Sequence, residues 1–343
     1  MSRDFLIVIG MLLVATSFLL LLTYSPPQST QEVVKLSSYN ITYLVRENHT
    51  YTLRENILLK NELNISVDEF IYVGMPLNTS NQECILISST LKAEGLKRDM
   101  DNNPILVFRV SLLPNESLWL NLTFNLRVLR YRLKYSGDVP WPSESLVDEC
   151  TPKRFWPVYN QTFIRLAKDI ALDAKNPIDA AYKVSRWILD HLEYTVSRRK
   201  GGEHALIKEM GHLKIVGDCE EVADVFTTIM RIIGIKSRVV KGLMLIGRED
   251  GEYYMWIKKV GETYEYSDNW GGHAWPQFYI EDFGWIDVEL LEGPDIKIGD
   301  LSEYHVKFNI EDRMYTGSTI SGMVVASQLS IMLEEYHFII GGG

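Results

Sequence analysis

The sequence predicts an α+β fold in which an immunoglobulin-like β-sandwich precedes a domain of helices and antiparallel strands. Alternating and β-branched runs, separated by Asn, Asp, Pro and Gly, fill residues 34–134. Residues 159–312 begin with amphipathic helical patterns and then return to short strand patterns. The chain has 343 residues, of which 46% are hydrophobic and 23% charged, so it is long enough for about two globular domains.

Residues 1–24 predict a membrane anchor. Phe5 to Leu22 form an apolar run of 18 residues, which nearly crosses a hydrocarbon core at about 1.5 Å per residue. Arg3 and the free amine favour a cytoplasmic N-terminus, against the effect of Asp4. A cleaved signal peptide is the alternative, but the two prolines after the run are poor neighbours for a cleavage site. We therefore expect a single-pass protein whose N-terminal helix binds the lipid bilayer, followed by a linker at residues 25–33 and an extracytoplasmic bulk.

The predicted sandwich carries two marks of an extracytoplasmic compartment. Cys84 and Cys150 are a pair that an oxidising compartment can join in a disulfide, with two unrelated free thiols as the alternative. N-x-S/T sequons cluster in this part of the chain, which indicates a solvent-facing domain that tolerates glycans. Their asparagines are Asn40, Asn48, Asn64, Asn78, Asn115, Asn121 and Asn160.

Residues 135–158 predict a connector, because four prolines punctuate them. Two helices follow it. The first has an apolar face that begins at Phe163, and the second opens with Asn176 as a cap and Pro177 in the first turn.

A third helix is predicted from its ends. Asp218 suits an N-cap, Glu221 completes a D-x-x-E variant of the capping box, and Gly234 supplies the C-terminal stop. Cys219 is then the first residue inside the helix, an exposed and electropositive position. There the helix dipole favours a thiolate, and unpaired backbone N–H groups can hold an oxyanion. A buried small hydrophobe is the alternative interpretation. The apolar stripe of this helix comprises Val222, Val225, Phe226, Ile229 and Ile233.

Short strands follow this helix, with a hairpin turn expected at Asp250 and Gly251. His273 opens a later strand, and Asp287 and Glu289 lie on the strand after it. Side chains at i and i+2 share a face of a strand, so both carboxylates point toward the histidine if either does. A thiol at a helix N-terminus, a histidine and a carboxylate are the parts that activate a cysteine nucleophile. Beside the histidine, the segment Trp270, Gly271 and Gly272 is predicted to line a substrate groove, because glycines give a loop freedom.

Four segments in this order resemble the transglutaminase-like superfamily: NPIDAAYKVSRWILDHLEY, GDCEEVADVFTTIMRIIGIKSRVVKG, GGHAWPQFYI and FGWIDVEL. The resemblance covers about 130 residues from Asn176 onward. It implies a papain-like core, in which a helix bearing the cysteine packs on an antiparallel sheet bearing the histidine and the acid. It also implies a Cys-His-Asp triad that transfers an acyl group through a thioester, and Cys219 and His273 match its first two members. With the anchor and the sandwich, the chain looks like a membrane-anchored prokaryotic type of this superfamily.

The third member of the triad departs from the superfamily pattern. That pattern has an aspartate four residues after a tryptophan, whereas here Glu289 stands four residues after Trp285. A glutamate is one methylene longer than an aspartate and can still orient an imidazole. We therefore expect Glu289 to be the acid, with Asp287 as the alternative.

Composition and motifs exclude several other classes of function. A net charge of −10 argues against nucleic-acid binding. The chain has no Gly-rich phosphate loop, no HExxH motif and no CxxC pair, and the spacing of His204, His212 and Cys219 matches no common metal site. We expect neither a cofactor nor a metal.

The sequence therefore predicts an extracytoplasmic cysteine enzyme that acts on peptide or protein amides. Water as the second acceptor gives a peptidase or deamidase, which we favour, and an amine gives a cross-linking transglutaminase. A surface protein that binds peptide or mediates adhesion without catalysis is the competing hypothesis, supported by the glutamate in place of aspartate. Residues 313–343 form a C-terminal extension of uncertain secondary structure, and our one expectation for it is that it packs on the core.

Overall fold

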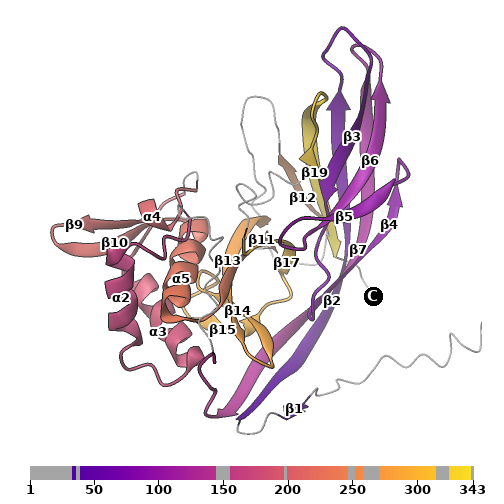
Figure 1. The fold of residues 1–343 in the computed structure, drawn as a ribbon. Helices are drawn as coiled ribbons and strands as arrows, with labels where there is room; N and C mark the ends of the chain where they lie inside the picture. The colour runs from indigo at the N-terminus through magenta and orange to yellow at the C-terminus, as the bar shows by residue number, and fades with distance from the viewer. Residues whose placement is uncertain are drawn as a thin grey trace, which may run out of the picture.

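The computed structural model describes residues 33–35, 39–143, 155–196, 199–245, 252–257, 270–313 and 324–340. Helices lie at one side of the molecule, long strands at the other, and a five-stranded sheet stands between them (Figure 1). The predicted anchor at residues 1–24 lies outside the described residues. Within the described part, no helix is long and apolar enough to span a bilayer.

The strand-rich side consists of two antiparallel sheets. A seven-stranded sheet is built on β2 (Tyr39–Lys60) and β7 (Ser117–Gly137), which pair along their whole length. Both sheets contribute side chains to one apolar core, among them Tyr51, Phe108 and Phe124. The other strands of the larger sheet are β1 (Val33–Lys35), β4 (Gln82–Ser89), β12 (Glu252–Ile257), β16 (Asp300–Leu301) and β19 (Ser330–Ile340), and the smaller sheet contains β18 (Val324–Val325), β3 (Val67–Gly74), β6 (Pro104–Leu112) and β5 (Gly95–Arg98).

These two sheets extend beyond residues 34–134. β19, which comes from the predicted C-terminal extension, pairs with β2 from Ser330 opposite Lys60 to Ile340 opposite Tyr51. Alternate side chains of β19, including Tyr336 and Phe338, enter the sandwich core, as expected for a strand with one buried face. The immunoglobulin-like type of the sandwich stays a prediction.

The predicted hairpin between β11 (Ser237–Leu245) and β12 is wrong. β11 pairs with β13 (Trp270–Ile280) on one edge and with β17 (His305–Glu311) on the other, so neither edge is left for β12. β12 instead pairs with β19 in the larger sheet. The turn residues Asp250 and Gly251 lie outside the described residues.

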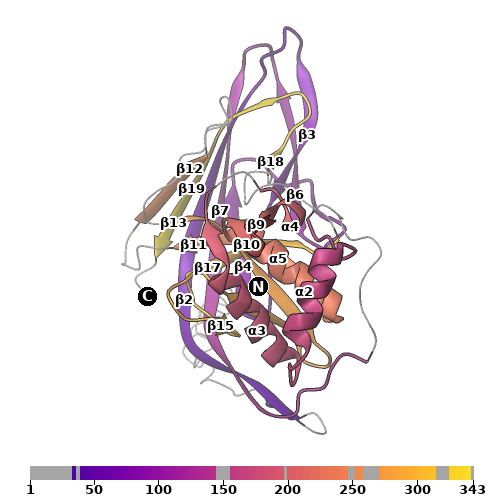
Figure 2. The ribbon, with the colours of Figure 1, turned by 90° about the vertical axis from the view of Figure 1, so that its left-hand side faces the viewer.

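The helix-bearing side confirms the helices expected from the sequence. They are α2 (Gln161–Ala171), capped by Asn160, α3 (Pro177–Asp190), capped by Asn176, and α5 (Cys219–Ile233), which ends at Gly234. Figure 2 shows these helices in front of the five-stranded sheet. That sheet has the order β15 (Lys297–Ile298), β14 (Gly284–Glu289), β13, β11 and β17, and a short helix α4 (Gly202–Ala205) and the small sheet β8 (Leu192–Tyr194), β10 (His212–Gly217) and β9 (Leu206–Glu209) complete this side.

The helix-bearing side and the strand-rich side are joined by strand pairing and by a common apolar core. β16 pairs with β7 in the sandwich sheet, where Leu301 lies opposite Tyr131. Leu243 of β11 and Phe308 of β17 join the apolar core of the sandwich. The long strands β2 and β7 therefore form part of the support of the five-stranded sheet, on the side away from α5 (Figure 1).

Candidate active site

Cys219 begins α5, as the sequence predicts. The capping box is confirmed: Glu220 N donates to Asp218 Oδ1 at 3.0 Å, and Asp218 N donates to Glu221 Oε2 at 3.0 Å. The expected exposure of Cys219 is wrong, because only 8% of the residue is accessible. Phe155, Trp156 and Ala274 cover this end of the helix. The side chain of Cys219 nevertheless forms a hydrogen bond with His273.

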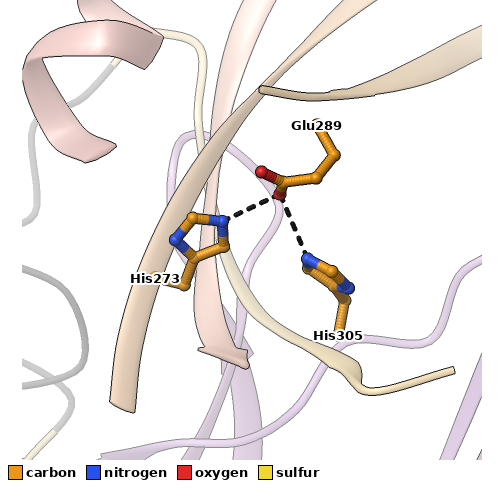
Figure 3. Close-up of side chains that lie close together, drawn as sticks. All are labelled: His273, Glu289 and His305. Carbon is orange, nitrogen blue, oxygen red and sulfur yellow. Dashed lines mark hydrogen bonds and ion pairs between the residues drawn. The ribbon is translucent and has the colours of Figure 1, made fainter. Parts of the chain in front are cut away.

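His273 lies on β13 between Cys219 and Glu289. Its Nε2 is 2.8 Å from Glu289 Oε2 (Figure 3). Burial alone lowers the pKa of His273, but the charge of Glu289 and hydrogen bonds with Cys219 and Glu289 outweigh burial and raise this pKa to about 10. Because Nε2 faces the carboxylate, Nδ1 is the nitrogen that can exchange a proton with Cys219. The imidazolium form of His273 is therefore strongly favoured in this site.

Glu289 is buried and accepts hydrogen bonds on both carboxylate oxygens. Its Oε1 accepts from the backbone N of Leu291 at 2.6 Å and of Glu292 at 3.1 Å. Its Oε2 faces His273 and a second histidine, His305, whose Nε2 is 3.1 Å away. Burial raises the pKa of Glu289, but the charge and hydrogen bond of His273 and the hydrogen bond of His305 bring it well below its ordinary value. The carboxylate is thus held in its charged form.

His305 was missed by the sequence analysis. It is fully buried at the start of β17, and its Nδ1 is 2.9 Å from Ser302 Oγ. Its ring stands edge-to-face against Trp275, with centroids 5.2 Å apart. One feature of the sequence could have indicated His305: polar residues alternate along β17 at His305, Lys307 and Asn309. Such alternation normally indicates a solvent-facing side, whereas here both faces of the strand are covered.

Residues 164–290 match the family model described as the transglutaminase-like superfamily. This part of the chain is a transglutaminase-like core domain. The crystal structure of a candidate cysteine protease from Cytophaga hutchinsonii is similar over 86% of this chain and 91% of that chain, with a TM-score of 0.52 and 13% sequence identity. At that identity the similarity supports the shared fold alone.

Two further comparisons are weaker. An uncharacterized protein from Haemophilus influenzae is 24% identical over 140 residues, which are 40% of this chain and 36% of that protein. The chain therefore matches little more than a third of that relative's length. The periplasmic domain of TgpA from Pseudomonas aeruginosa aligns over 75% of this chain and 94% of that chain, with a TM-score of 0.32 and 13% identity.

Within the transglutaminase-like core, Asp287 does not contact His273. Its Oδ1 accepts from Trp275 Nε1 at 2.8 Å and from Gln277 Nε2 at 2.7 Å. Its Oδ2 accepts from Lys307 Nζ at 2.8 Å and from the hydroxyl of Tyr131. Asp287 and Glu289 do share a face of β14, as predicted, but Asp287 serves a separate buried network.

The first turns of α5 are also held by buried charges. Arg199 donates through Nε to Asp224 Oδ2 at 2.8 Å and through Nη1 to Glu311 Oε2 at 2.6 Å. Lys241 Nζ lies 3.2 Å from Glu220 Oε1 and 3.1 Å from Glu311 Oε1. This network ties the helix that carries Cys219 to β11 and β17, so it fixes the helix against the sheet that carries His273.

The predicted groove residues are placed only in part. Gly271 and Gly272 lie in β13, opposite Met244 and Leu243, rather than in a loop. The side chain of Trp270 lies outside the described residues, so the groove stays a prediction. Among the described residues, two groups could hold a metal ion, and neither includes His204 or His212: they are His273, Glu289 and His305, and Glu47, His49 and Glu303.

Cys84 is a free buried thiol in the structure, and because Cys150 lies outside the described residues, the bridge between them stays a prediction. Cys84 faces the sandwich core, and burial raises its pKa to about 12. Of the sequon asparagines, Asn78 bonds the backbone of Cys84 through its amide, Asn160 caps α2, and the side chain of Asn40 is not described. Glycosylation stays a prediction; the exposed sequon positions are Asn48, Asn64, Asn78, Asn115 and Asn121.

Proposed function

We propose that this chain is a cysteine-dependent acyl-transfer enzyme that hydrolyses amide bonds of peptides or proteins. The observation that carries the proposal is the position of His273, which bonds Cys219 on one side and Glu289 on the other. A thiol, an imidazole and an orienting carboxylate in this order are the machinery of nucleophilic cysteine catalysis. The match to the transglutaminase-like superfamily supports the same chemistry.

The proposed reaction has two steps. Cys219 Sγ attacks the amide carbonyl, and the proton held on His273 Nδ1 passes to the leaving amine as the C–N bond breaks and a thioester forms. The backbone N–H of Cys219, at the first position of α5, stabilises the oxyanion, because the capping box already occupies the N–H groups of Asp218 and Glu220. Water then attacks the thioester, gives a proton to His273 and releases the carboxylic acid. Glu289 keeps the imidazole oriented and stabilises its cation throughout.

The reactivity of the thiol tests this proposal. Iodoacetamide at neutral pH should alkylate Cys219 much faster than Cys84, because the imidazolium of His273 stabilises a thiolate whereas Cys84 is a buried thiol. His273→Ala should slow the labelling of Cys219 and leave Cys84 unchanged. Peptide mass spectrometry resolves the two sites. Equal, slow labelling of both would instead support the non-catalytic peptide-binding function.

A second experiment separates hydrolysis from cross-linking. The protein is incubated with casein, with and without a fluorescent alkylamine. Hydrolysis gives new peptide termini or free ammonia, whereas transamidation incorporates the amine into casein. The Cys219→Ser variant is the control for both readings. Predominant incorporation of the amine would reassign the protein as a cross-linking enzyme.

We also propose that the chain acts outside the cytoplasm, anchored by its N-terminal segment. The support is the apolar run from Phe5 to Leu22 and the clustered sequons. The full chain should fractionate with membranes, and a chain beginning near Gln31 should be soluble. A mature N-terminus near Ser25 would show that the segment is a cleaved signal peptide.

A further inference from the structure

We propose that His305 is a positioning residue that holds Glu289 in the orientation needed to pair with His273. The inference rests on the proposed function, because it gives a role to a residue that acts through the triad acid. Figure 3 shows both histidines directed at the same carboxylate.

The hydrogen bond with Glu289 places one proton of His305. Glu289 Oε2 can only accept, so Nε2 of His305 carries the proton that lies between them at 3.1 Å. The Nδ1 atom of a neutral ring is then an acceptor, and Ser302 Oγ, 2.9 Å away, can donate to it. The contact with Ser302 therefore helps to orient the ring of His305 so that its Nε2 meets Glu289.

A glutamate needs more support in this role than an aspartate. The extra methylene adds a rotatable bond, and that freedom must be removed before the carboxylate can orient an imidazole. Backbone N–H groups of Leu291 and Glu292 hold Oε1, and His305 is a second donor to Oε2 beside His273. Glu289 is therefore held at both oxygens, which restricts the additional rotatable bond of its side chain.

The close pairing of β17 with β11 positions His305 next to Glu289. Gly242 lies opposite His273 in the sheet and next to a bulge where β11 meets β17. A Cβ atom at Gly242 would stand 1.9 Å from the carbonyl oxygen of Val306. The missing side chain thus allows β17 to approach closely enough for His305 to reach Glu289.

The test compares His305→Leu with His305→Gln, which keeps an amide N–H donor. The readout is the rate of Cys219 alkylation by iodoacetamide across a range of pH. His305→Leu should lower this rate on the order of tenfold below neutral pH. In the plot of rate against pH, the rise on the acidic side should move to higher pH by about one unit, since each unit corresponds to a tenfold change. His305→Gln should recover part of the loss. His337→Leu removes another histidine that pairs with a glutamate, on β19, and should change nothing.

A double-mutant cycle decides whether His305 acts through Glu289. In a Glu289→Gln background, His305→Leu should cause no further loss. Independent, multiplicative losses would overturn the inference, and so would a bound zinc ion whose removal reproduces the effect of His305→Leu. If His305→Leu fails to fold, Ser302→Ala replaces it, because this variant removes only the hydroxyl beside Nδ1 of His305. It should move the acidic side of the rate profile in the same direction, and an unchanged profile would overturn the inference.

The controls separate this inference from the proposed function. Wild-type Cys219 that reacts no faster than Cys84 would contradict the function itself. Fast labelling of Cys219 that depends on His273 but not on His305 would contradict only the role of His305.

Discussion

At the scale of single residues, the two carboxylates of β14 neutralise different cations. Glu289 faces a histidine, which can lose its proton if the carboxylate is removed. Asp287 faces Lys307, a buried lysine whose pKa is lowered by burial and raised by the charge and hydrogen bond of Asp287. Replacing a carboxylate by an amide should consequently impair catalysis at Glu289, whereas at Asp287 it should mainly reduce stability.

We expect Glu289→Gln to reduce turnover by on the order of 10²–10⁴-fold, because His273 loses the partner that keeps it protonated and oriented. Asp287→Asn should lower the free energy of unfolding by about 3 kcal/mol, because it leaves Lys307 buried without its charged partner. Casein hydrolysis and urea unfolding measure the two effects. A larger catalytic loss in Asp287→Asn, with unchanged stability, would move the acid role to Asp287.

The pKa of His273 also predicts how stability varies with pH. A pKa raised from 6.5 to about 10 in the folded protein contributes stability that is complete below pH 6.5 and is lost as the pH rises through 10. The free energy of unfolding of the wild type should therefore fall between these values, and that of His273→Gln should fall less. Urea titrations across this range measure the difference. Parallel curves for the two proteins would contradict the raised pKa.

At the scale of elements, the close approach of β17 to β11 depends on Gly242. We expect Gly242→Ala to cost about 3 kcal/mol and to slow the alkylation of Cys219, because a Cβ there forces β17 away from the sheet. Gly95→Ala on β5 is the matched control, since its Cβ would meet nothing within 4 Å. Thermal unfolding compares the two variants. Equal stability of both would show that the strands can separate without cost.

The elements that could be predicted from the sequence are those whose signals are local. The ends of α5 depend on Asp218, Glu221 and Gly234, which are a few residues from the backbone they cap, so the helix and the place of Cys219 were predictable. The pairing of β12 was not, because it depends on which sheet edges remain open after the chain has folded. His305 was missed for a related reason: its role depends on burial of both faces of β17, which a single strand pattern does not reveal.

At the scale of the whole molecule, the strand β19 completes the sandwich from the far end of the chain. Phe338→Ala should lower the free energy of unfolding by about 3–5 kcal/mol, because this side chain is fully buried in the sandwich core. Ile339→Ala, at the next position and on the opposite face of the strand, should cost much less. Urea unfolding followed by tryptophan fluorescence compares them. Similar losses would show that β19 is not fixed in this register.

The order of the strand-rich part and the helix-bearing part along the chain could be predicted from the sequence. The strand pairing that joins the two parts could not. A strand-rich part before a helix-and-sheet part follows from the change of hydrophobic period near residue 160. Contacts such as that of Tyr131 with Asp287 join residues 156 positions apart, and no local pattern marks them.

The matched segment, residues 164–290, is not self-sufficient as a module. It contains Cys219, His273 and Glu289 but ends before His305 and Lys307, and it begins after Tyr131. A graft of this segment onto another scaffold would carry Cys219, His273 and Glu289 without the donors that Tyr131, His305 and Lys307 supply to the two carboxylates. The support of the candidate site therefore extends beyond the matched segment in both directions along the chain, so a shortened protein needs the flanking strands as well.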